Sequence, residues 1–203
     1  MKKLIIFDLD GVLVDACEWH RLALNAALKE VCDYEISLDD HYTFFNGIPT
    51  KVKLDMLTDK KIVPKELHHD IFQLKQKFTI EIINEKAKYR IEKVEMINFL
   101  KNKGHHVACF TNSIKETALL MLDKTGILKL LDCVITNEDV KNPKPDPEGY
   151  NFLVDKFNID KKNVIIVEDS PKGIQAAKSA ECNVIEVKDP TEVNLMLFKD
   201  CVR

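Results

Sequence analysis

Five short apolar runs, rich in Val, Ile and Phe, constrain the fold of this chain more than any other feature. Continuous apolar runs of this length are typical of strands that are buried on both faces of a sheet. Segments with helical patterns separate most of the runs, and this alternation predicts an α/β fold with a parallel sheet. The runs are Leu4–Phe7, Val107–Phe110, Cys133–Ile135, Val164–Val167 and Val184–Val187.

The segments between the runs carry residues that begin and end helices. Glycine follows some of the expected helices, as it often does at a helix C-terminus, and proline stands in the first turn of others. Together with the strands, these helices predict a three-layer, Rossmann-like core with helices on both faces of the sheet. The expected helices are Ile91–Lys103 before Gly104, Lys115 to about Lys124 with a cap near Ser113, a helix from Asp146-Pro147 to Lys156, and one from Ser170-Pro171 to Ala180.

One interval, from Asp15 to Tyr89, contains helical patterns but no convincing strand. It is far longer than a crossover between neighbouring strands requires, so we predict an inserted all-helical cap domain. The predicted domains are an α/β core of residues 1–14 and 90–203 and a cap of residues 15–89. The expected cap helices are Cys17–Val31, Leu38–Phe45, Lys51–Leu57 and Pro64–Lys88, separated by Gly47, Pro49 and Pro64.

Composition and charge argue against several kinds of partner. The chain has 203 residues and a formal net charge of −3, without the basic balance of nucleic-acid-binding proteins. No apolar run approaches the roughly 20 residues of a membrane span, and no signal-peptide pattern follows Lys2 and Lys3. The six cysteines are scattered without a C-x-x-C pair, which is typical of free thiols in a reducing cytoplasm. We therefore expect a cytoplasmic monomer that binds neither nucleic acid nor membrane.

Polar side chains follow the expected strands at the points where the strands end. Because the carboxyl ends of parallel strands meet at one edge of a sheet, these side chains are predicted to converge. Any one of them could be a turn or helix-cap residue, but their convergence at one edge indicates a functional site. The residues are Asp8, Asp10 and Gly11 after the first run, Thr111, Asn112 and Ser113 after the second, Lys144 shortly after the third, and Glu168 and Asp169 after the fourth.

In this order, the strand-end residues resemble the motifs of the haloacid dehalogenase-like superfamily. The motifs are Asp8–Asp15 (DLDGVLVD), Thr111-Asn112, Lys144-Pro145 and Glu168-Asp169. The helical interval resembles the cap that the β-phosphoglucomutase-like branch carries between its first and second motifs. The resemblance implies a phosphatase that uses Mg²⁺ as cofactor and a small phosphorylated molecule as substrate.

The resemblance also implies a role for each motif residue. Asp8 would be the nucleophile that forms an aspartyl-phosphate, and Asp10 would be the general acid and base. The side chains of Asp8 and Asp169 and the backbone carbonyl of Asp10 would hold Mg²⁺, with Glu168 as a further metal-site residue close by. The other motif residues would bind the phosphate: Thr111 by its hydroxyl, Asn112 by its backbone amide, Lys144 by its charge, and Gly11 by a tight turn that admits backbone amides.

The helical interval is expected to supply substrate specificity, as lids do in general. In the branch named above, a segment like Asn46–Lys51 faces the active site, so Lys51 or Lys53 would meet the substrate where that branch usually has Arg. His20 has a spacing that would place it at the hinge between core and cap. The missing Arg, together with Ala16 in place of a Thr or Ser, favours hydrolysis of a sugar phosphate or a similar phosphomonoester.

Three alternatives compete with a phosphatase. A β-phosphoglucomutase-like phosphomutase would pass the phosphate through Asp8 without losing it to water. A signalling receiver domain also presents Asp, Thr or Ser, and Lys, but it accepts phosphate at its third strand and has no large helical insertion after its first. A non-catalytic binding protein could use the same fold, although the intact set of acidic and basic residues argues against that class.

Overall fold

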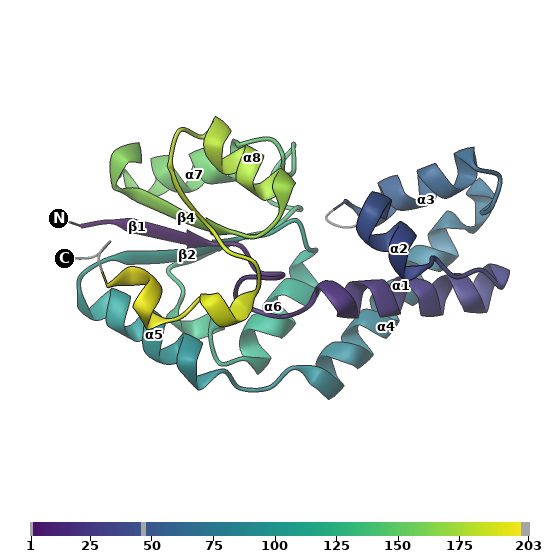
Figure 1. Cartoon of the computed structure of the whole chain (residues 1–203), viewed down its shortest axis with the longest axis horizontal. Coiled ribbons are helices and arrows are strands. Elements are labelled where there is room, and N and C mark those ends of the chain that lie inside the picture. Colours follow the sequence, from purple (N-terminus) through teal and green to yellow (C-terminus); the bar gives the residue numbers. More distant parts are fainter. Residues whose placement is uncertain (1, 46–47, 200–203) are drawn as a thin grey trace. The chain divides into compact units, whose positions relative to one another are not determined.

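The structure is a computed structural model in which residues 2–45 and 48–199 are described (Figure 1). Contacts within the chain divide it into two compact units. The α/β unit comprises Met1–Asp15 and Lys88–Arg203, and the helical unit comprises Ala16–Ala87. The cap predicted at 15–89 differs from the helical unit by one residue at its start and two at its end.

Among the described residues, five strands form one parallel sheet in the order β3-β2-β1-β4-β5, which confirms the predicted α/β class. The end of β5 lies one residue before the end of the run that predicted it. Val187 is outside the strand, although its N–H still donates to the carbonyl of Glu168 at 2.9 Å. The strands are β1 (Leu4–Phe7), β2 (His106–Phe110), β3 (Cys133–Ile135), β4 (Val164–Glu168) and β5 (Asn183–Glu186).

The register of β1, the central strand, decides which residues meet at the edge of the sheet. Its last residue, Phe7, is paired with Cys109 of β2 and Val167 of β4. All three strands therefore end at nearly the same level. The connections run to one side of β1 through β2 and β3 and to the other side through β4 and β5, and open α/β sheets bind ligands at such a switch point.

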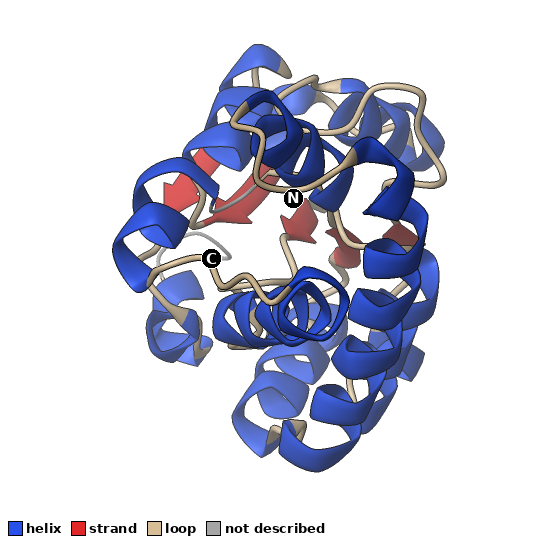
Figure 2. Cartoon of the chain, turned by 90° about the vertical axis from the view of Figure 1, so that its right-hand side faces the viewer, coloured by secondary structure: helices blue, strands red, loops and turns tan. Residues whose placement is uncertain are grey.

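Helices cover both faces of the sheet. In Figure 1, α7 (Glu148–Phe157) and α8 (Pro171–Ser179) lie on one face, and α5 (Ile91–Asn102) and α6 (Lys115–Lys124) lie on the other. Figure 2 shows the strands, in red, with helices on either side. Apolar residues of α7 and α8, among them the fully buried Tyr150, pack against the sheet in one continuous cluster. The predicted three-layer core is therefore present.

The helix starts follow the sequence signals in one place and depart from them in another. Ser170 is the N-cap of α8, and its Oγ accepts a hydrogen bond from the N–H of Gly173 at 3.1 Å. The cap predicted near Ser113 falls on Ile114, whose side chain makes no capping hydrogen bond. The Ser113 hydroxyl donates instead to Asp10, so the residue that looked like a cap belongs to the strand-end cluster.

Short 3₁₀ turns complete the α/β unit, and one buried lysine fixes the segment that contains the last two. Lys93 of α5 is only 1% exposed. Its ammonium donates to the carbonyl of Pro190 at 2.5 Å and to that of Val193, and burial lowers the pKa of Lys93 to about 8. The turns are Leu128–Leu130, Lys161–Asn163, Pro190–Glu192 and Leu195–Phe198.

The helical unit contains no strand in its described part, as the sequence predicts. Its two long helices, α1 (Cys17–Cys32) and α4 (His68–Lys86), pack along each other, and they share an apolar core with α3. Gly47, which the sequence suggests as a helix boundary, lies with Asn46 outside the described residues. The shorter elements are α2 (Leu38–Asp40), a π-helical segment (His41–Phe45), α3 (Thr50–Asp59) and a 3₁₀ turn (Lys65–Leu67).

Candidate active site

Asp8 directly follows the central strand and lies at the middle of the candidate site. Its N–H donates to the carbonyl of Val167 at 3.0 Å, which continues the ladder between β1 and β4 by one residue. Its side chain is buried and accepts a hydrogen bond at Oδ1 from the ammonium of Lys144 at 2.6 Å. The fold therefore brings Asp8 to Lys144, a residue 136 positions away in sequence, which lies in the connection between β3 and α7.

Lys144 holds a buried positive charge at the centre of this network. Its Nζ donates to Asp8 Oδ1, to Glu168 Oε1 at 2.5 Å and to the carbonyl of Phe110 at 2.8 Å, which matches the number of protons on an ammonium. Burial by itself would lower the pKa of Lys144, but the carboxylates of Asp8 and Glu168 outweigh burial and hold that pKa above its ordinary value. The amine therefore stays charged.

The backbone of Lys144 is fixed by the side chain of Asn112. The Asn112 amide donates from Nδ2 to the carbonyl of Lys144 at 3.1 Å and accepts at Oδ1 from the N–H of Lys144 at 3.0 Å. The sequence predicts only a backbone contact to phosphate for Asn112. In the structure its side chain positions the lysine.

Three carboxylates gather beside the lysine: Asp8, Glu168 and Asp169 each place an oxygen within 4.8 Å of the others. Burial raises the pKa of Asp169 to about 7, and the charge of Glu168 adds to this effect. Burial also raises the pKa of Asp8 well above its usual range, against the opposing effect of Lys144. Asp169 Oδ1 is buried without a hydrogen-bond partner. The ionised forms of these side chains repel one another, and one buried oxygen is unsatisfied. A hard divalent cation such as Mg²⁺ would favour the ionised forms, so these residues fit the predicted metal.

Glu168 differs from the other two carboxylates because several donors already hold it. It is fully buried, and besides Lys144 it accepts hydrogen bonds from the hydroxyl of Tyr150 at 2.7 Å and from Ser170 Oγ at 3.3 Å. The N–H of Asp169 donates to Glu168 Oε2 at 3.2 Å. Because both Glu168 oxygens already accept hydrogen bonds, Glu168 is better placed to orient Lys144 and Asp169 than to bind a metal ion directly.

Two glycines leave room for these carboxylates. Gly11 has φ of +90°, and a Cβ there would lie 2.1 Å from Asp169 Oδ2. A Cβ at Gly173 of α8 would lie 1.9 Å from Glu168 Oε1. Gly11 was predicted to form a tight turn, and its positive φ and its hydrogen bond from N–H to the carbonyl of Val14 at 2.7 Å agree with that expectation. The spatial role of Gly173 could not be predicted from the sequence.

Asp10 points its carboxylate toward the end of β2. Its Oδ2 accepts a hydrogen bond from Ser113 Oγ at 2.7 Å and a longer one from Thr111 Oγ1 at 3.4 Å. The N–H of Ser113 in turn donates to Thr111 Oγ1 at 3.0 Å. The predicted acid/base residue and the predicted phosphate-binding hydroxyl are thus neighbours. The side chain of Asp10 is not part of the three-carboxylate cluster, and the sequence assigns it to the metal through its backbone carbonyl.

The sequence assigned no catalytic or binding role to two further residues of the site, Tyr150 and Ser113. Tyr150 is fully buried on α7, its ring lies 5.2 Å from the Lys144 ammonium, and its hydroxyl donates to Glu168. The sequence signal that could have identified Tyr150 is a tyrosine on an otherwise apolar helix face, because a buried Tyr hydroxyl needs a polar partner. Ser113 carried a competing signal, since a serine just before a helix usually indicates its cap.

The candidate residues of the helical unit can be placed only within that unit. Lys51 is exposed on α3, and Lys53 is buried. His20 of α1 lies with its Nδ1 at 3.4 Å from the ammonium of Lys75 on α4. The proposed contacts of Lys51 and His20 with substrate stay predictions, and Asn46 and Gly47, from the segment predicted to face the active site, lie outside the described residues.

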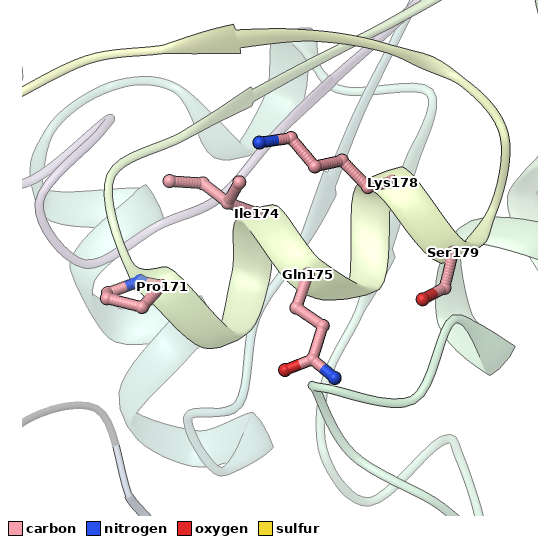
Figure 3. Close-up of a pocket in the computed structure, with 5 residues that line it drawn as sticks. All are labelled: Pro171, Ile174, Gln175, Lys178 and Ser179. Atoms are coloured by element: carbon pink, nitrogen blue, oxygen red, sulfur yellow. The ribbon is translucent and has the colours of Figure 1, made fainter.

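A hollow along α8 lies elsewhere on the α/β unit. It is lined by residues of that helix (Figure 3), and Lys178 among them is bonded to Glu186 at 2.7 Å. None of the predicted site residues lines it. The lining residues are Pro171, Ile174, Gln175, Lys178 and Ser179.

The fold and the strand-end cluster define an α/β enzyme whose switch point combines acidic residues, a buried lysine and hydroxyl groups. The family described as haloacid dehalogenase-like hydrolase matches residues 5–187. The chain belongs to that family, and the prediction of an enzyme of this hydrolase class is confirmed. In the described part of the chain, no helix combines the length and apolar character of a membrane span.

Several relatives with named activities are phosphatases. The chain is 29% identical over 180 residues to the phosphorylated carbohydrates phosphatase of Thermotoga maritima, covering 87% of this chain and 80% of that protein. It is 30% identical over 189 residues to the phosphoglycolate phosphatase of Haemophilus influenzae, covering 90% and 84%. The crystal structure of β-phosphoglucomutase from Clostridium difficile superposes with a TM-score of 0.81 at 21% identity, covering 100% and 97%. At that identity the structural match shows the shared fold alone.

Proposed function

We propose that this chain is a magnesium-dependent phosphatase that hydrolyses small phosphomonoesters, with sugar phosphates as its substrate class, and that Asp8 is the nucleophile. The observation that carries the proposal is the placement of Asp8 at the switch point, 2.6 Å from a protonated, buried Lys144 and inside a carboxylate cluster that fits Mg²⁺. The phosphatase relatives, one of which is named for phosphorylated carbohydrates, support the reaction and the substrate class.

The residues divide the reaction into two displacements. An Asp8 oxygen attacks phosphorus, and the bond from phosphorus to the substrate oxygen breaks while Asp10 donates a proton to that oxygen. Water then attacks the aspartyl-phosphate, Asp10 takes the proton of the water, and phosphate leaves with Asp8 restored. Lys144 keeps a positive charge beside Asp8 through both steps, as phosphoryl transfer requires.

Mg²⁺ would be held by the side chains of Asp8 and Asp169 and by the backbone carbonyl of Asp10, with Glu168 orienting the site. When bound, Mg²⁺ offsets the repulsion between the anionic nucleophile and the anionic phosphate. The hydroxyl of Thr111 and the backbone amide of Asn112 bind the phosphate oxygens in this proposal, as does Lys144.

The helical unit is proposed as the cap that selects the substrate. Lys51 is exposed on α3, so its ammonium can meet an anionic substrate without disturbing the core of its own unit. His20 would contribute from α1. We further propose that the protein acts as a monomer in the cytoplasm, where a reducing environment matches the free thiols of the described cysteines.

Release of inorganic phosphate from a panel of sugar phosphates and other phosphomonoesters tests this function. We expect hydrolysis with Mg²⁺, loss of activity with EDTA, and a fall of at least about 10³-fold in Asp8→Asn, because removal of a nucleophile abolishes the covalent route. Hydrolysis that survives in Asp8→Asn would refute the mechanism. Isomerisation of a sugar phosphate without release of phosphate would replace the phosphatase with the phosphomutase.

A further inference from the structure

The side chain of Asp10 is held by Ser113, a residue outside the roles assigned so far. We propose that Ser113 is a positioning residue for general acid catalysis: its hydroxyl fixes the orientation of the Asp10 carboxyl from which the proton passes to the leaving oxygen. The proposal rests on the function proposed above and adds to it a residue that controls the proton-transfer step.

The first support is the geometry of the bond. Ser113 Oγ donates to Asp10 Oδ2 at 2.7 Å, the usual length for a hydroxyl donor and an oxygen acceptor. Thr111 Oγ1 is 3.4 Å from the same oxygen, beyond the usual range for such a bond. Ser113 is therefore the stronger of the two hydroxyl contacts. It joins residues 103 positions apart, so the alignment of β1 beside β2 is what creates it.

The second support is that Ser113 is itself fixed. Its N–H donates to Thr111 Oγ1 at 3.0 Å, and its carbonyl accepts from the N–H of Asn137 at 3.3 Å. Both of its main-chain polar groups are thus held by residues at the ends of β2 and β3. Ser113 also does not cap α6, whose N-cap is Ile114.

The third support is the set of backbone hydrogen bonds in the loop that carries Asp10. The carbonyl of Leu9 accepts from the N–H groups of Leu13 and Val14 at 3.0 and 2.9 Å, and the N–H of Gly11 donates to the carbonyl of Val14. These bonds fix the backbone around Asp10, so the orientation of its carboxyl group depends on the torsions of the Asp10 side chain. Catalysis depends on placing the reacting atoms within about 1 Å, so a hydroxyl that restricts those torsions acts directly on the rate of proton transfer.

The role of Ser113 can be separated from a general structural role by varying the leaving group. General acid help is needed for the alkoxide of a sugar or alkyl phosphate, whereas the p-nitrophenolate of p-nitrophenyl phosphate leaves with little protonation. kcat/KM reports the steps up to departure of the leaving group, before hydrolysis of the aspartyl-phosphate. The ratio of kcat/KM for the two substrate types therefore measures acid catalysis in the first displacement.

We expect Ser113→Ala to lower kcat/KM about 10- to 100-fold for the best sugar phosphate of the panel, a part of the roughly 10²- to 10⁴-fold that general acid catalysis supplies. For p-nitrophenyl phosphate we expect a change below about 3-fold. Ser113→Thr, which keeps a hydroxyl, should restore most of the loss. Ser179→Ala, which removes an exposed hydroxyl on α8, should alter neither value.

An equal fall for both substrates, or no fall for either, would overturn the proposal. If Ser113→Ala does not fold, Ser113→Cys serves in its place, because the thiol keeps the volume but donates weakly, and the same selective loss is expected. The proposed function is judged separately by Asp8→Asn. If Asp8→Asn abolishes hydrolysis while Ser113→Ala leaves both kcat/KM values unchanged, the phosphatase function is supported and the proposed role of Ser113 is refuted.

Discussion

The α/β unit and the helical unit both bury charged groups, but they combine them differently. In the α/β unit, Lys144 lies between Asp8 and Glu168, so a buried cation is bonded to buried carboxylates at 2.6 and 2.5 Å. Among the described residues of the helical unit, the buried titratable side chains are all bases: His41, Lys53 and Lys75. The acidic Glu18 of that unit is half-buried and bonded to Arg21 at 2.6 Å.

This difference in buried charge agrees with different proposed roles for the two units, catalysis and substrate recognition. A network of opposite charges fixes its own geometry, which suits a site where a nucleophile and a metal must be held in place before substrate arrives. The buried lysines Lys53 and Lys75 give the helical unit positive charge, which suits the recognition of an anion such as a phosphate ester. The contrast agrees with the proposed roles of the two units, chemistry in the α/β unit and substrate selection in the helical unit. Variants in matched pairs test it.

The largest effect is expected from removing the buried cation of the α/β unit. Lys144→Met leaves Asp8 and Glu168 buried without their counter-charge, so we expect the free energy of unfolding to fall by about 3–5 kcal/mol and activity to disappear. Lys75→Met is the matched variant in the helical unit. The contacts of Lys75 include Gln76 at 3.2 Å and His20 at 3.4 Å. Because no acidic side chain is buried among the described residues of that unit, we expect a smaller loss than in Lys144→Met. Urea unfolding measures the free energy of unfolding of both variants. Equal losses would contradict the inferred difference between the two units in how buried lysines are paired.

A methyl group at Gly11 should weaken the metal site. The Cβ of Gly11→Ala would meet Asp169 Oδ2 at 2.1 Å, so we expect the concentration of Mg²⁺ that gives half-maximal activity to rise about 10-fold or more. The stabilisation of the protein by Mg²⁺ in a thermal melt should shrink as well. Gly104→Ala is the control, because it has a similar φ of +82° but nothing within 4 Å of the added Cβ. A rise in the Gly104 variant of the same size would assign the effect to backbone strain.

The hydroxyl of Tyr150 should contribute a smaller amount. Tyr150→Phe removes the donor at 2.7 Å from Glu168 but keeps the ring against Lys144 and Phe110. We expect the free energy of unfolding to fall by about 1–2 kcal/mol, close to the range for a buried hydrogen bond to a charged group. Chemical denaturation measures this change. An unchanged free energy would mean that Lys144 and the backbone amides satisfy Glu168 without Tyr150.

A change of pH is expected to alter stability with opposite signs in the two units. Burial, with the nearby charges of Lys53 and Arg21, lowers the pKa of His41 to about 4, so the unfolded chain binds more protons and stability falls as pH drops from about 6.5 to 4. Asp169 has its pKa raised to about 7, so the metal-free protein loses stability as pH rises from about 4 to 7. Unfolding in EDTA over this range of pH compares the wild type with each variant. His41→Gln should reduce the first dependence and Asp169→Asn the second, to which the raised pKa of Asp8 also contributes. A variant whose stability follows pH as the wild type does would contradict the assignment.

The strands and the order of the reactive residues could be predicted from the sequence because the relevant information is local. A run such as Leu4–Phe7 has no polar face to turn toward water, so it fits a central strand buried on both sides. Residues that follow such runs must reach the same edge of a parallel sheet, and the convergence of Asp8, Thr111 and Glu168 follows from that rule alone. The inserted helices could be recognised in the same way, from the absence of a strand pattern.

The contacts among those residues depend on the tertiary structure. Ser113 binds Asp10, Asn112 brackets Lys144, and Tyr150 binds Glu168, and in each case the partners lie on different segments of the chain. Periodicity and cap signals describe neighbours along the chain, whereas the register of β1 against β2 and β4 sets which distant side chains come within hydrogen-bond distance. The sequence by itself thus determined the fold and the identity of the reactive groups around Asp8. Only the packed sheet decided which hydroxyl, amide and lysine hold each of them in place.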